Sequence, residues 1–585
     1  MALEGSIATE ALQSVQSFLE DKGSSLSGPG LHAITALLET LESGLNGELD
    51  PVYFLSSIDP GIGKTLSVSM FLKAWKDRGS LPASSVLVGV SRLSEIEAYV
   101  DTSGLAETDF GVLTRDTASN SLGVRREVLG SVPILFTTQQ MIESRTRNRP
   151  FSAATEFHYQ DEPRTLRIWD ESLIPARPLS LRADDLGQLA TPLRHRHPKF
   201  VEAVEGLQET LRQAKLGEVI LVPDSLETLA PRTGVGPAAT VKTLARMAGR
   251  KMLLVDGGKG DRALIGSAQS LPEDFAPVVI LDASGRVRAT YRLWEQHRAT
   301  LRRLPAAQSD YRNLTIRLWQ QGTGQATLEN PTNRTRIVEA IAKVINDEGQ
   351  DDWLIVHYKR NGAIFEEVSA LVENRPATRL HSLTWGRHHG TNDYAYVSNV
   401  VIVGQLNYGD ISFHAHGAAA SGLPADQLGD LNVKDVAWGE FQHNLLQALC
   451  RSSVRQGTRG VAGQCRAYIV TSPHPDIEAR VRAVFPGCRL WPWPSVDAPM
   501  TGRRGEVAQY LLKAFENPAV DVVRKADMHR HMGIHRSNFS ALIKHAEFQD
   551  FLGRELIFSE GQRFVKHRVS FAPFPGGGWL GDGED

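Results

Sequence analysis

The sequence predicts an α/β protein with two blocks of parallel β-sheet, a mostly helical insertion between them and a small helical domain, winged-helix or helix-turn-helix-like, at the end. Apolar runs typical of strands alternate with helix-like stretches between residues 50 and 171, and again from about residue 311. Such alternation favours a parallel sheet with helices on both faces. Residues 172–249 lose this pattern and contain the helix-like run PKFVEAVEGLQETLRQAKLG. We therefore expect two separate sheets rather than one.

The expected elements follow in a regular order. Residues 31–45, LHAITALLETLESGL, have Leu and Ile at helical spacing. Strands are expected at 52–58 and from residues 84, 132 and 165, and later in KMLLVDGG, APVVILDASG, RNLTIRLW, DDWLIVHYK, SNVVIVGQL and CRAYIVTS. The predicted organisation is an N-terminal helical segment (1–49), a first lobe (50–171 and 250–290), an insertion (172–249), a second lobe (310–500), a C-terminal helix-turn-helix-like module (505–572) and a disordered tail (573–585).

Composition narrows the class of protein. Hydrophobic residues make up 41% and charged residues 22%, as in ordinary globular proteins. No run approaches the roughly 20 apolar residues of a membrane-spanning helix, and the N-terminus lacks the pattern of a secretory signal. Three cysteines without a CxxC pair argue against a disulfide framework, cysteine-held zinc or an iron–sulfur cluster. We expect a cytoplasmic protein without a membrane partner, and the net charge of −3 gives no global sign of nucleic-acid binding.

The clearest chemical signal is the run IDPGIGKT at 58–65, between an apolar strand and a helix. Glycines let backbone N–H groups approach a phosphate closely, and a lysine and a hydroxyl then reach the terminal phosphates and Mg²⁺. The run begins with Ile58, where the P-loop consensus has Gly or Ala. The sequence predicts ATP and Mg²⁺ as cofactors, bound by Pro60, Gly61, Ile62, Gly63, Lys64 and Thr65.

Two adjacent carboxylates end a later apolar strand, TLRIWDE. Asp170 suits a Mg²⁺ ligand together with Thr65, and Glu171 suits a group that orients and deprotonates an attacking water. A P-loop alone is also typical of kinases, transporters and switches. The order of the remaining motifs distinguishes among these classes.

Residues 50–475 resemble a superfamily 2 (DEAD-like) helicase or translocase with two RecA-like lobes. PGIGKT resembles motif I, VLVGVSRLSEI motif Ia, WDES motif II, LDASG motif III, LIVHYK motif IV, TWGRHHGTNDYAYVSNVVIVG motif V and QALCRSSVRQG motif VI. The resemblance implies that nucleotide state is coupled to nucleic acid through Asp282, Ser284, Gly390, Thr391 and Asp393. Motif II ends in Ser172 where the best-known subgroups have Asp or His, so the subgroup stays open.

Arg451 and Arg455 are four residues apart, which predicts that they share one face of a helix. The resemblance implies that they reach the γ-phosphate from the second lobe and act in catalysis with Lys64 and Glu171. The alternative is an exposed basic helix face.

The run KADMHRHMGIHRSNFSALIK at 525–544 matches a helix-turn-helix pattern. Arg536, Asn538 and Lys544 are expected on the exposed face of the second helix, where such modules contact DNA. The alternative is a helical hairpin that packs against the motor or a protein partner.

The sequence as a whole favours an ATP-hydrolysing helicase or translocase that acts on DNA, with RNA as the other candidate substrate. The alternative from another class is an ATP-switched DNA-binding regulator, or a mobile-element or defence component, that does not unwind its substrate. Stimulation of ATP hydrolysis by nucleic acid distinguishes the two.

Overall fold

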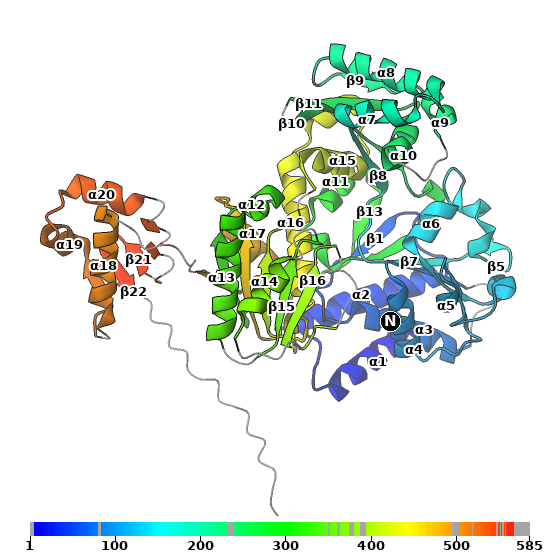
Figure 1. Cartoon of the computed structure of the whole chain (residues 1–585). Coiled ribbons are helices and arrows are strands. Elements are labelled where there is room, and N and C mark those ends of the chain that lie inside the picture. Colours follow the sequence, from blue (N-terminus) through cyan, green and yellow to red (C-terminus); the bar gives the residue numbers. More distant parts are fainter. Residues whose placement is uncertain are drawn as a thin grey trace, which may run out of the picture.

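The structure, a computed structural model, describes residues 5–79, 84–231, 238–258, 260–348, 351–359, 363–373, 379–386, 393–406, 408–493, 502–517, 519–545, 548–549, 551–552, 555 and 557–566. Gly390, Thr391 and the predicted disordered tail at 573–585 lie outside these residues. Figure 1 shows a two-lobed body, an inserted domain above it and a small C-terminal module at its side. Among the described residues, no helix has both the length and the apolar character needed to cross a membrane.

The first lobe contains a seven-stranded parallel sheet in the order β13-β1-β12-β7-β2-β4-β3. Its strands are β1 (Tyr53–Ser56), β2 (Val86–Val90), β3 (Phe110–Leu113), β4 (Ile134–Thr138), β7 (Leu166–Asp170), β12 (Val278–Leu281) and β13 (Leu301–Arg303). The hairpin of β5 (His158–Tyr159) and β6 (Glu162–Pro163) lies outside this sheet. The central strands are buried on both faces, which explains their continuous apolar runs.

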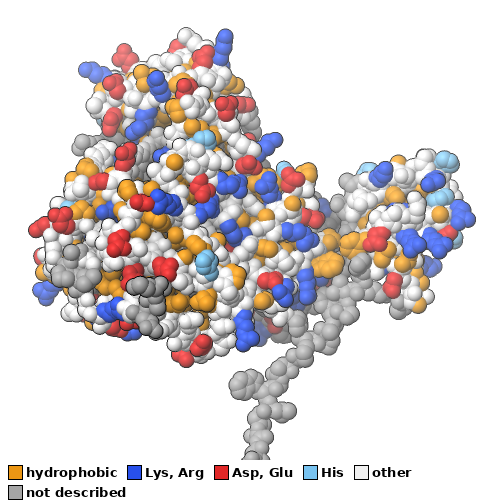
Figure 2. Space-filling view, turned by 180° about the vertical axis from the view of Figure 1, so that it is seen from behind, with side chains coloured by type: hydrophobic (Ala, Val, Ile, Leu, Met, Phe, Trp, Pro, Cys, Tyr) orange, Lys and Arg blue, Asp and Glu red, His pale blue; other side chains and the backbone are white. Residues whose placement is uncertain are grey.

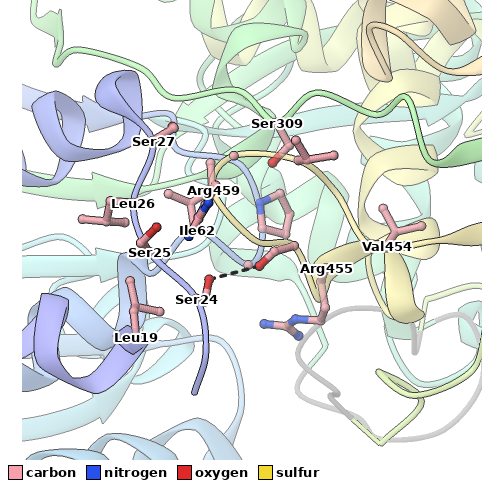
Figure 3. Close-up of a pocket in the computed structure, with 15 residues that line it drawn as sticks. Leu19, Ser24, Ser25, Leu26, Ser27, Ile62, Ser309, Val454, Arg455 and Arg459 are labelled. Carbon is pink, nitrogen blue, oxygen red and sulfur yellow. Dashed lines mark hydrogen bonds between the residues drawn. The ribbon is translucent and has the colours of Figure 1, made fainter. Parts of the chain in front are cut away.

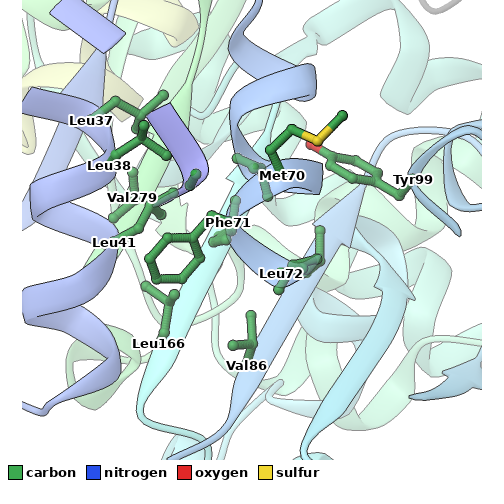
Figure 4. Packing of buried hydrophobic residues seen from close by; sticks show 14 of the residues in the cluster. Leu37, Leu38, Leu41, Met70, Phe71, Leu72, Val86, Tyr99, Leu166 and Val279 are labelled. Atoms are coloured by element: carbon green, nitrogen blue, oxygen red, sulfur yellow. The ribbon is translucent and has the colours of Figure 1, made fainter. Parts of the chain in front are cut away.

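Helices from several segments of the first lobe pack around this sheet. They are α1 (Ile7–Asp21), α2 (Gly28–Leu45), α3 (Lys64–Asp77), α4 (Leu93–Ser103), α5 (Thr117–Asn120), α6 (Gln139–Arg145) and α11 (Ala289–Arg298). The N-terminal helices are part of the lobe, because Leu37 and Leu41 of α2 pack with Phe71 of α3 in one buried cluster (Figure 4). This cluster fixes α3, and with it the loop that precedes it.

The second lobe contains a six-stranded parallel sheet in the order β16-β15-β17-β18-β14-β19. Its strands are β14 (Leu314–Gln320), β15 (Trp353–His357), β16 (Leu380–Thr384), β17 (Asn399–Val403), β18 (Cys465–Thr471) and β19 (Arg489–Pro492). Its helices are α12 (Gln325–Glu329), α13 (Pro331–Asp347), α14 (Ala363–Leu371), α15 (Asp410–Ser421), α16 (Val433–Leu449) and α17 (Ile477–Val484). The predicted α/β class with two parallel sheets is confirmed.

The inserted domain is larger than the segment 172–249. It has a four-stranded antiparallel sheet, in the order β8-β11-β10-β9, with β8 (Ala176–Arg182), β9 (Val219–Leu221), β10 (Lys251–Gly258) and β11 (Asp261–Gln269). Its helices are α7 (Ala183–Leu193), α8 (Pro198–Gln213), α9 (Ser225–Leu229) and α10 (Ala238–Met247). The assignment of 250–269 to the first lobe was therefore wrong. An apolar run predicts a strand but not its sheet, and β10 and β11 pair as a hairpin.

One face of the inserted sheet packs on the second lobe. Leu253 and Ile265 of the sheet share a buried cluster with Ile411 and Ala418 of α15. The other face packs against α7, α8 and α10. The inserted domain therefore interrupts the sequence of the first lobe but packs against the second lobe.

The C-terminal module has its own hydrophobic core. It comprises α18 (Gly502–Glu516), β20 (Val522–Arg524), α19 (Lys525–His531), α20 (Arg536–Lys544), β21 (Ile557–Glu560) and β22 (Arg563–Lys566), with an antiparallel sheet in the order β20-β22-β21. Trp491 of β19 meets Phe558 of β21, with ring centroids 6.5 Å apart. The described part of the segment predicted as a winged-helix or helix-turn-helix-like domain therefore contains helices and a small antiparallel sheet.

Candidate active site

The loop between β1 and α3 has the backbone that a phosphate cradle needs. Gly61 and Gly63 have φ values of 90° and 123°, which L side chains rarely adopt. Lys64 is the first residue of α3, and its ammonium donates a hydrogen bond to the carbonyl oxygen of Ile58. Burial lowers the pKa of Lys64, although the carboxylates of Asp59 and Asp170 oppose this. Helix α3 begins directly at this loop, and the N-terminus of a helix favours a bound anion.

The two adjacent carboxylates lie at the end of β7. Asp170 is buried, and its Oδ2 accepts a hydrogen bond of 2.6 Å from the Tyr99 hydroxyl. Burial raises the pKa of both acids, and that of Glu171 reaches about 6. Glu171 has a φ of 84°, a conformation that costs a non-glycine residue about 1–3 kcal/mol. Its N–H donates to the carbonyl oxygen of Leu281 in β12, which helps to hold this strained conformation.

The second lobe brings its arginines to this site. Arg451 Nη2 lies 3.7 Å from Glu171 Oε1 and donates a 2.9 Å hydrogen bond to Gln447 Oε1. A Cβ on Gly61 would lie 2.1 Å from the carbonyl oxygen of Arg455, so the second lobe directly covers the glycine loop. Burial lowers the pKa of both arginines.

The prediction that Arg451 and Arg455 share a helix face was wrong. Helix α16 ends at Leu449, and Arg455 belongs to the short 3-10 helix η9 (Ser453–Arg455). The Ser452 hydroxyl accepts a hydrogen bond from the N–H of Val454 and starts this new turn. Arg451 still reaches Glu171 of the first lobe, and the backbone carbonyl of Arg455 lies over the glycine loop.

A pocket beside the glycine loop was not predicted. It lies between the α1–α2 connection, residues 60–62 and residues 454–461 of the second lobe, with Arg455 and Arg459 on its wall (Figure 3). The Ser24 hydroxyl donates to the carbonyl oxygen of Gly457 at 3.4 Å, and the N–H of Arg459 donates to that of Ser25 at 3.2 Å. The small polar run SSLSGPG between two helices is the sequence feature that could have indicated it.

Asp59, which sequence reasoning also missed, joins the glycine loop to the second lobe. It is fully buried and accepts hydrogen bonds from Arg286, the N–H of Ser309 and the Tyr311 hydroxyl, at 2.9, 3.1 and 2.7 Å. Arg286 also donates to the carbonyl oxygens of Ala483 and Val484, at 2.9 and 2.7 Å. One carboxylate therefore links the loop, the interlobe segment and α17.

Asp282 and Ser284 reach the same interface. Asp282 Oδ1 accepts hydrogen bonds from the N–H and hydroxyl of Ser284, at 2.8 and 2.6 Å. Ser284 Oγ lies 2.7 Å from Nδ1 of His443 on α16. Next to them, Arg288 and Glu440 form a buried ion pair across the lobes. The motif III-like segment thus touches both lobes.

The remaining predicted residues lie elsewhere. Asp393 is exposed in the segment before β17. Arg536, Asn538 and Lys544 are exposed on α20. On the face seen in Figure 2, Lys, Arg and His side chains gather on the C-terminal module.

No protein-family model matches the sequence, and no curated protein matches it. Solved structures overlap with the chain, and three of them illustrate the likeness. They are S. tokodaii Xpd4 (12% identity, 77% of this chain and 99% of that chain, TM-score 0.45), S. cerevisiae Dbp5 bound to RNA and ADP BeF3 (9%, 80% and 94%, 0.38) and Mycobacterium smegmatis helicase Lhr bound to ssDNA and AMP-PNP (13%, 95% and 58%, 0.28). The function of this chain has to be derived from its own residues.

Proposed function

We propose that the chain is an ATP-dependent helicase or translocase that hydrolyses ATP between its two lobes and acts on DNA. The observation that carries the proposal is the approach of Arg451 in the second lobe to Glu171 in the first, 3.7 Å apart and beside the glycine loop. A site completed by two lobes makes hydrolysis depend on lobe closure. Such dependence is what a motor needs to convert hydrolysis into movement.

Each residue has a distinct role in the proposed site. The glycine loop and Lys64 bind the phosphates of ATP. Thr65, exposed at the start of α3, and Asp170 offer the oxygen ligands that Mg²⁺ prefers, and the bound ion neutralises phosphate charge. Glu171, with a pKa of about 6, is ionised at neutral pH and accepts a proton from the attacking water.

The two arginines act from the second lobe. The Arg451 guanidinium pairs with Glu171. Binding of ATP would exchange this carboxylate partner for the γ-phosphate and release Glu171 to bind water. Arg455, whose backbone lies on Gly61, is placed to stabilise the same negative charge.

The contacts around Asp59 and Ser284 would transmit lobe movement. Asp59 adjoins the phosphate-binding residues, and its partner Arg286 binds carbonyl groups of α17. Ser284 contacts His443 of α16. A change in the phosphate loop therefore shifts two helices of the second lobe, which is the coupling that we propose between hydrolysis and movement along a strand.

The C-terminal module is proposed to tether this motor to DNA. Its order of helix, strand, two helices and hairpin supports a winged-helix-like module, in which we propose α20 as the recognition helix. Helix α20 has no acidic residue and exposes Arg536, Asn538 and Lys544. These side chains suit contacts with phosphates and base edges.

The direct test is ATP hydrolysis with single-stranded DNA, duplex DNA, RNA or no nucleic acid, for the wild type and Lys64→Ala. We expect stimulation by DNA, and loss of hydrolysis in Lys64→Ala. Lys73→Ala is the matched control, because Lys73 lies on the same helix but pairs with Asp77 at the surface. A wild-type rate in Lys64→Ala would refute the proposed site.

The ATP-switched regulator remains the second candidate, and the buried Arg288–Glu440 pair favours it. The two charged groups of this pair belong to different lobes and would have to separate whenever the lobes opened, which favours a long-lived closed state. Strand separation on 5′-tailed, 3′-tailed and blunt substrates distinguishes the two. ATP-dependent strand separation supports the motor. ATP-dependent DNA binding without separation or movement supports the switch.

A further inference from the structure

Helix α4 presents Tyr99 to the acidic end of β7. The side chain is fully buried, and its ring packs against Phe136 with centroids 5.9 Å apart. Met70 of α3 lies beside it (Figure 4). The hydroxyl donates to Asp170 Oδ2 at 2.6 Å, and the nearby Thr65 side chain has a small lowering effect on the raised pKa of the tyrosine. A single hydroxyl therefore holds one residue that is proposed to bind Mg²⁺ and lies near the other.

We infer that Tyr99 is a positioning residue that orients Asp170 for Mg²⁺-bound nucleotide. The inference rests on the proposed function. An Asp side chain at the end of a strand can rotate about two bonds, and the hydroxyl fixes it by holding one carboxylate oxygen. With Oδ2 held by the tyrosine, Oδ1 is the oxygen that we propose to bind the cation. Hydrogen bonds of this outer kind orient metal ligands and typically change metal affinity by about 10–100-fold.

The helix that carries Tyr99 is itself held in a defined register. Helix α4 starts at Leu93 directly after the turn that follows β2, and a capping box closes its N-terminus. In that box the Glu95 carboxylate accepts hydrogen bonds from the N–H groups of Ser91 and Arg92, at 3.0 and 3.1 Å. Tyr99 is one turn further on the same face. The start of α4 therefore determines where the hydroxyl lies.

A buried tyrosine needs a partner for its hydroxyl, so a purely structural role must be distinguished from positioning. Tyr468 offers the comparison. It is also buried, and its hydroxyl donates to Glu348 Oε1 at 2.7 Å in the second lobe. Loss of either hydroxyl removes a similar hydrogen bond, but only Tyr99 contacts a proposed metal ligand.

The test measures binding of a fluorescent, non-hydrolysable ATP analogue to the full chain at increasing Mg²⁺, and in EDTA. Wild type should bind more tightly with Mg²⁺. Tyr99→Phe keeps the ring, and should raise the Mg²⁺ midpoint about 10–100-fold while leaving the affinity in EDTA unchanged. Tyr468→Phe should keep the wild-type midpoint. In an Asp170→Asn background, Tyr99→Phe should cause no further shift.

The outcomes separate the two proposals. A Tyr99→Phe midpoint within about twofold of wild type refutes the role of Tyr99, as does an undiminished shift in the Asp170→Asn background. If the affinity of the wild type for the ATP analogue does not depend on Mg²⁺, the proposed function is refuted as well. Far-ultraviolet circular dichroism of each variant reports whether it is folded, and weaker binding in EDTA by a folded Tyr99→Phe also refutes the assignment.

Discussion

The buried pair of Arg288 and Glu440 should dominate the stability of the lobe interface. Arg288 caps α11 of the first lobe, and Glu440 lies on α16 of the second. Their side chains are only 6% and 1% exposed, with hydrogen bonds of 2.6 and 2.9 Å. Burial alone disfavours the carboxylate, but Arg288 outweighs this and lowers the pKa of Glu440. Both groups are therefore charged, and each depends on the other.

Removal of one partner leaves a buried charge, which costs about 3–5 kcal/mol. We expect this loss for Arg288→Met and for Glu440→Leu. The Arg288→Met/Glu440→Leu double variant should recover most of it, because well-packed apolar side chains can replace a buried ion pair at little or no cost. Arg288 Nη1 has no hydrogen-bond partner in the described part of the chain, which makes the apolar replacement more favourable still.

The test is urea unfolding of the wild type, the two single variants and the double variant. These four proteins form a double-mutant cycle that gives the interaction energy of Arg288 with Glu440. A chain of several domains can unfold in more than one step. We expect the substitutions at the lobe interface to affect the unfolding step that occurs at the lowest urea concentration. Single variants that lose less than about 1 kcal/mol would refute the reasoning. So would a double variant whose loss equals the sum of the single losses.

Three further predictions concern other parts of the chain. Gly439→Ala should destabilise the interface by about 1–3 kcal/mol in urea unfolding, because a Cβ there would lie 2.4 Å from the N atom of Ala289. Burial, with Asp170 and Glu171 nearby, raises the pKa of Glu95 from 4.5 to about 8, so the folded protein holds this proton more tightly than the unfolded chain. The free energy of unfolding should therefore fall as the pH rises between these values. In thermal unfolding without Mg²⁺, the melting temperature of Glu95→Gln relative to wild type should rise over the same pH range. Arg536→Ala and Lys544→Ala should each weaken DNA binding and reduce the slope of log affinity against log salt by about 1.

Matched controls exist for two of these predictions. Gly206 lies in α8, and a Cβ at this position would have nothing within 4 Å, so Gly206→Ala should be neutral or stabilising. Equal losses at Gly439 and Gly206 would contradict the close-contact argument. Arg503 lies on α18 and pairs with Glu506, so Arg503→Ala should leave the salt slope unchanged. A pH-independent difference between Glu95→Gln and wild type would contradict the predicted titration.

Much of the fold could be predicted from the local pattern of apolar and polar residues in the sequence. The alternation of apolar strands and helices predicted both parallel sheets, and the glycine loop was expected between a strand and a helix, where β1 and α3 enclose it. The two arginines were expected near the nucleotide, but their shared helix face was wrong because α16 ends before Arg451. Backbone periodicity predicts a helix better than it predicts where the helix stops.

The sequence by itself determined the residues of the proposed nucleotide site, namely the glycine loop, Lys64 and the acids at the end of β7, and the basic character of α20. Only the tertiary structure decided which groups meet. Asp59 lies within the glycine-loop run but has no predicted role there, and His443 and Tyr99 belong to no motif. Each acquires its role from partners distant in the chain. Local spacing encodes secondary structure and short motifs because these depend on near neighbours. Contacts between lobes depend instead on how whole elements pack, and no local pattern contains that information.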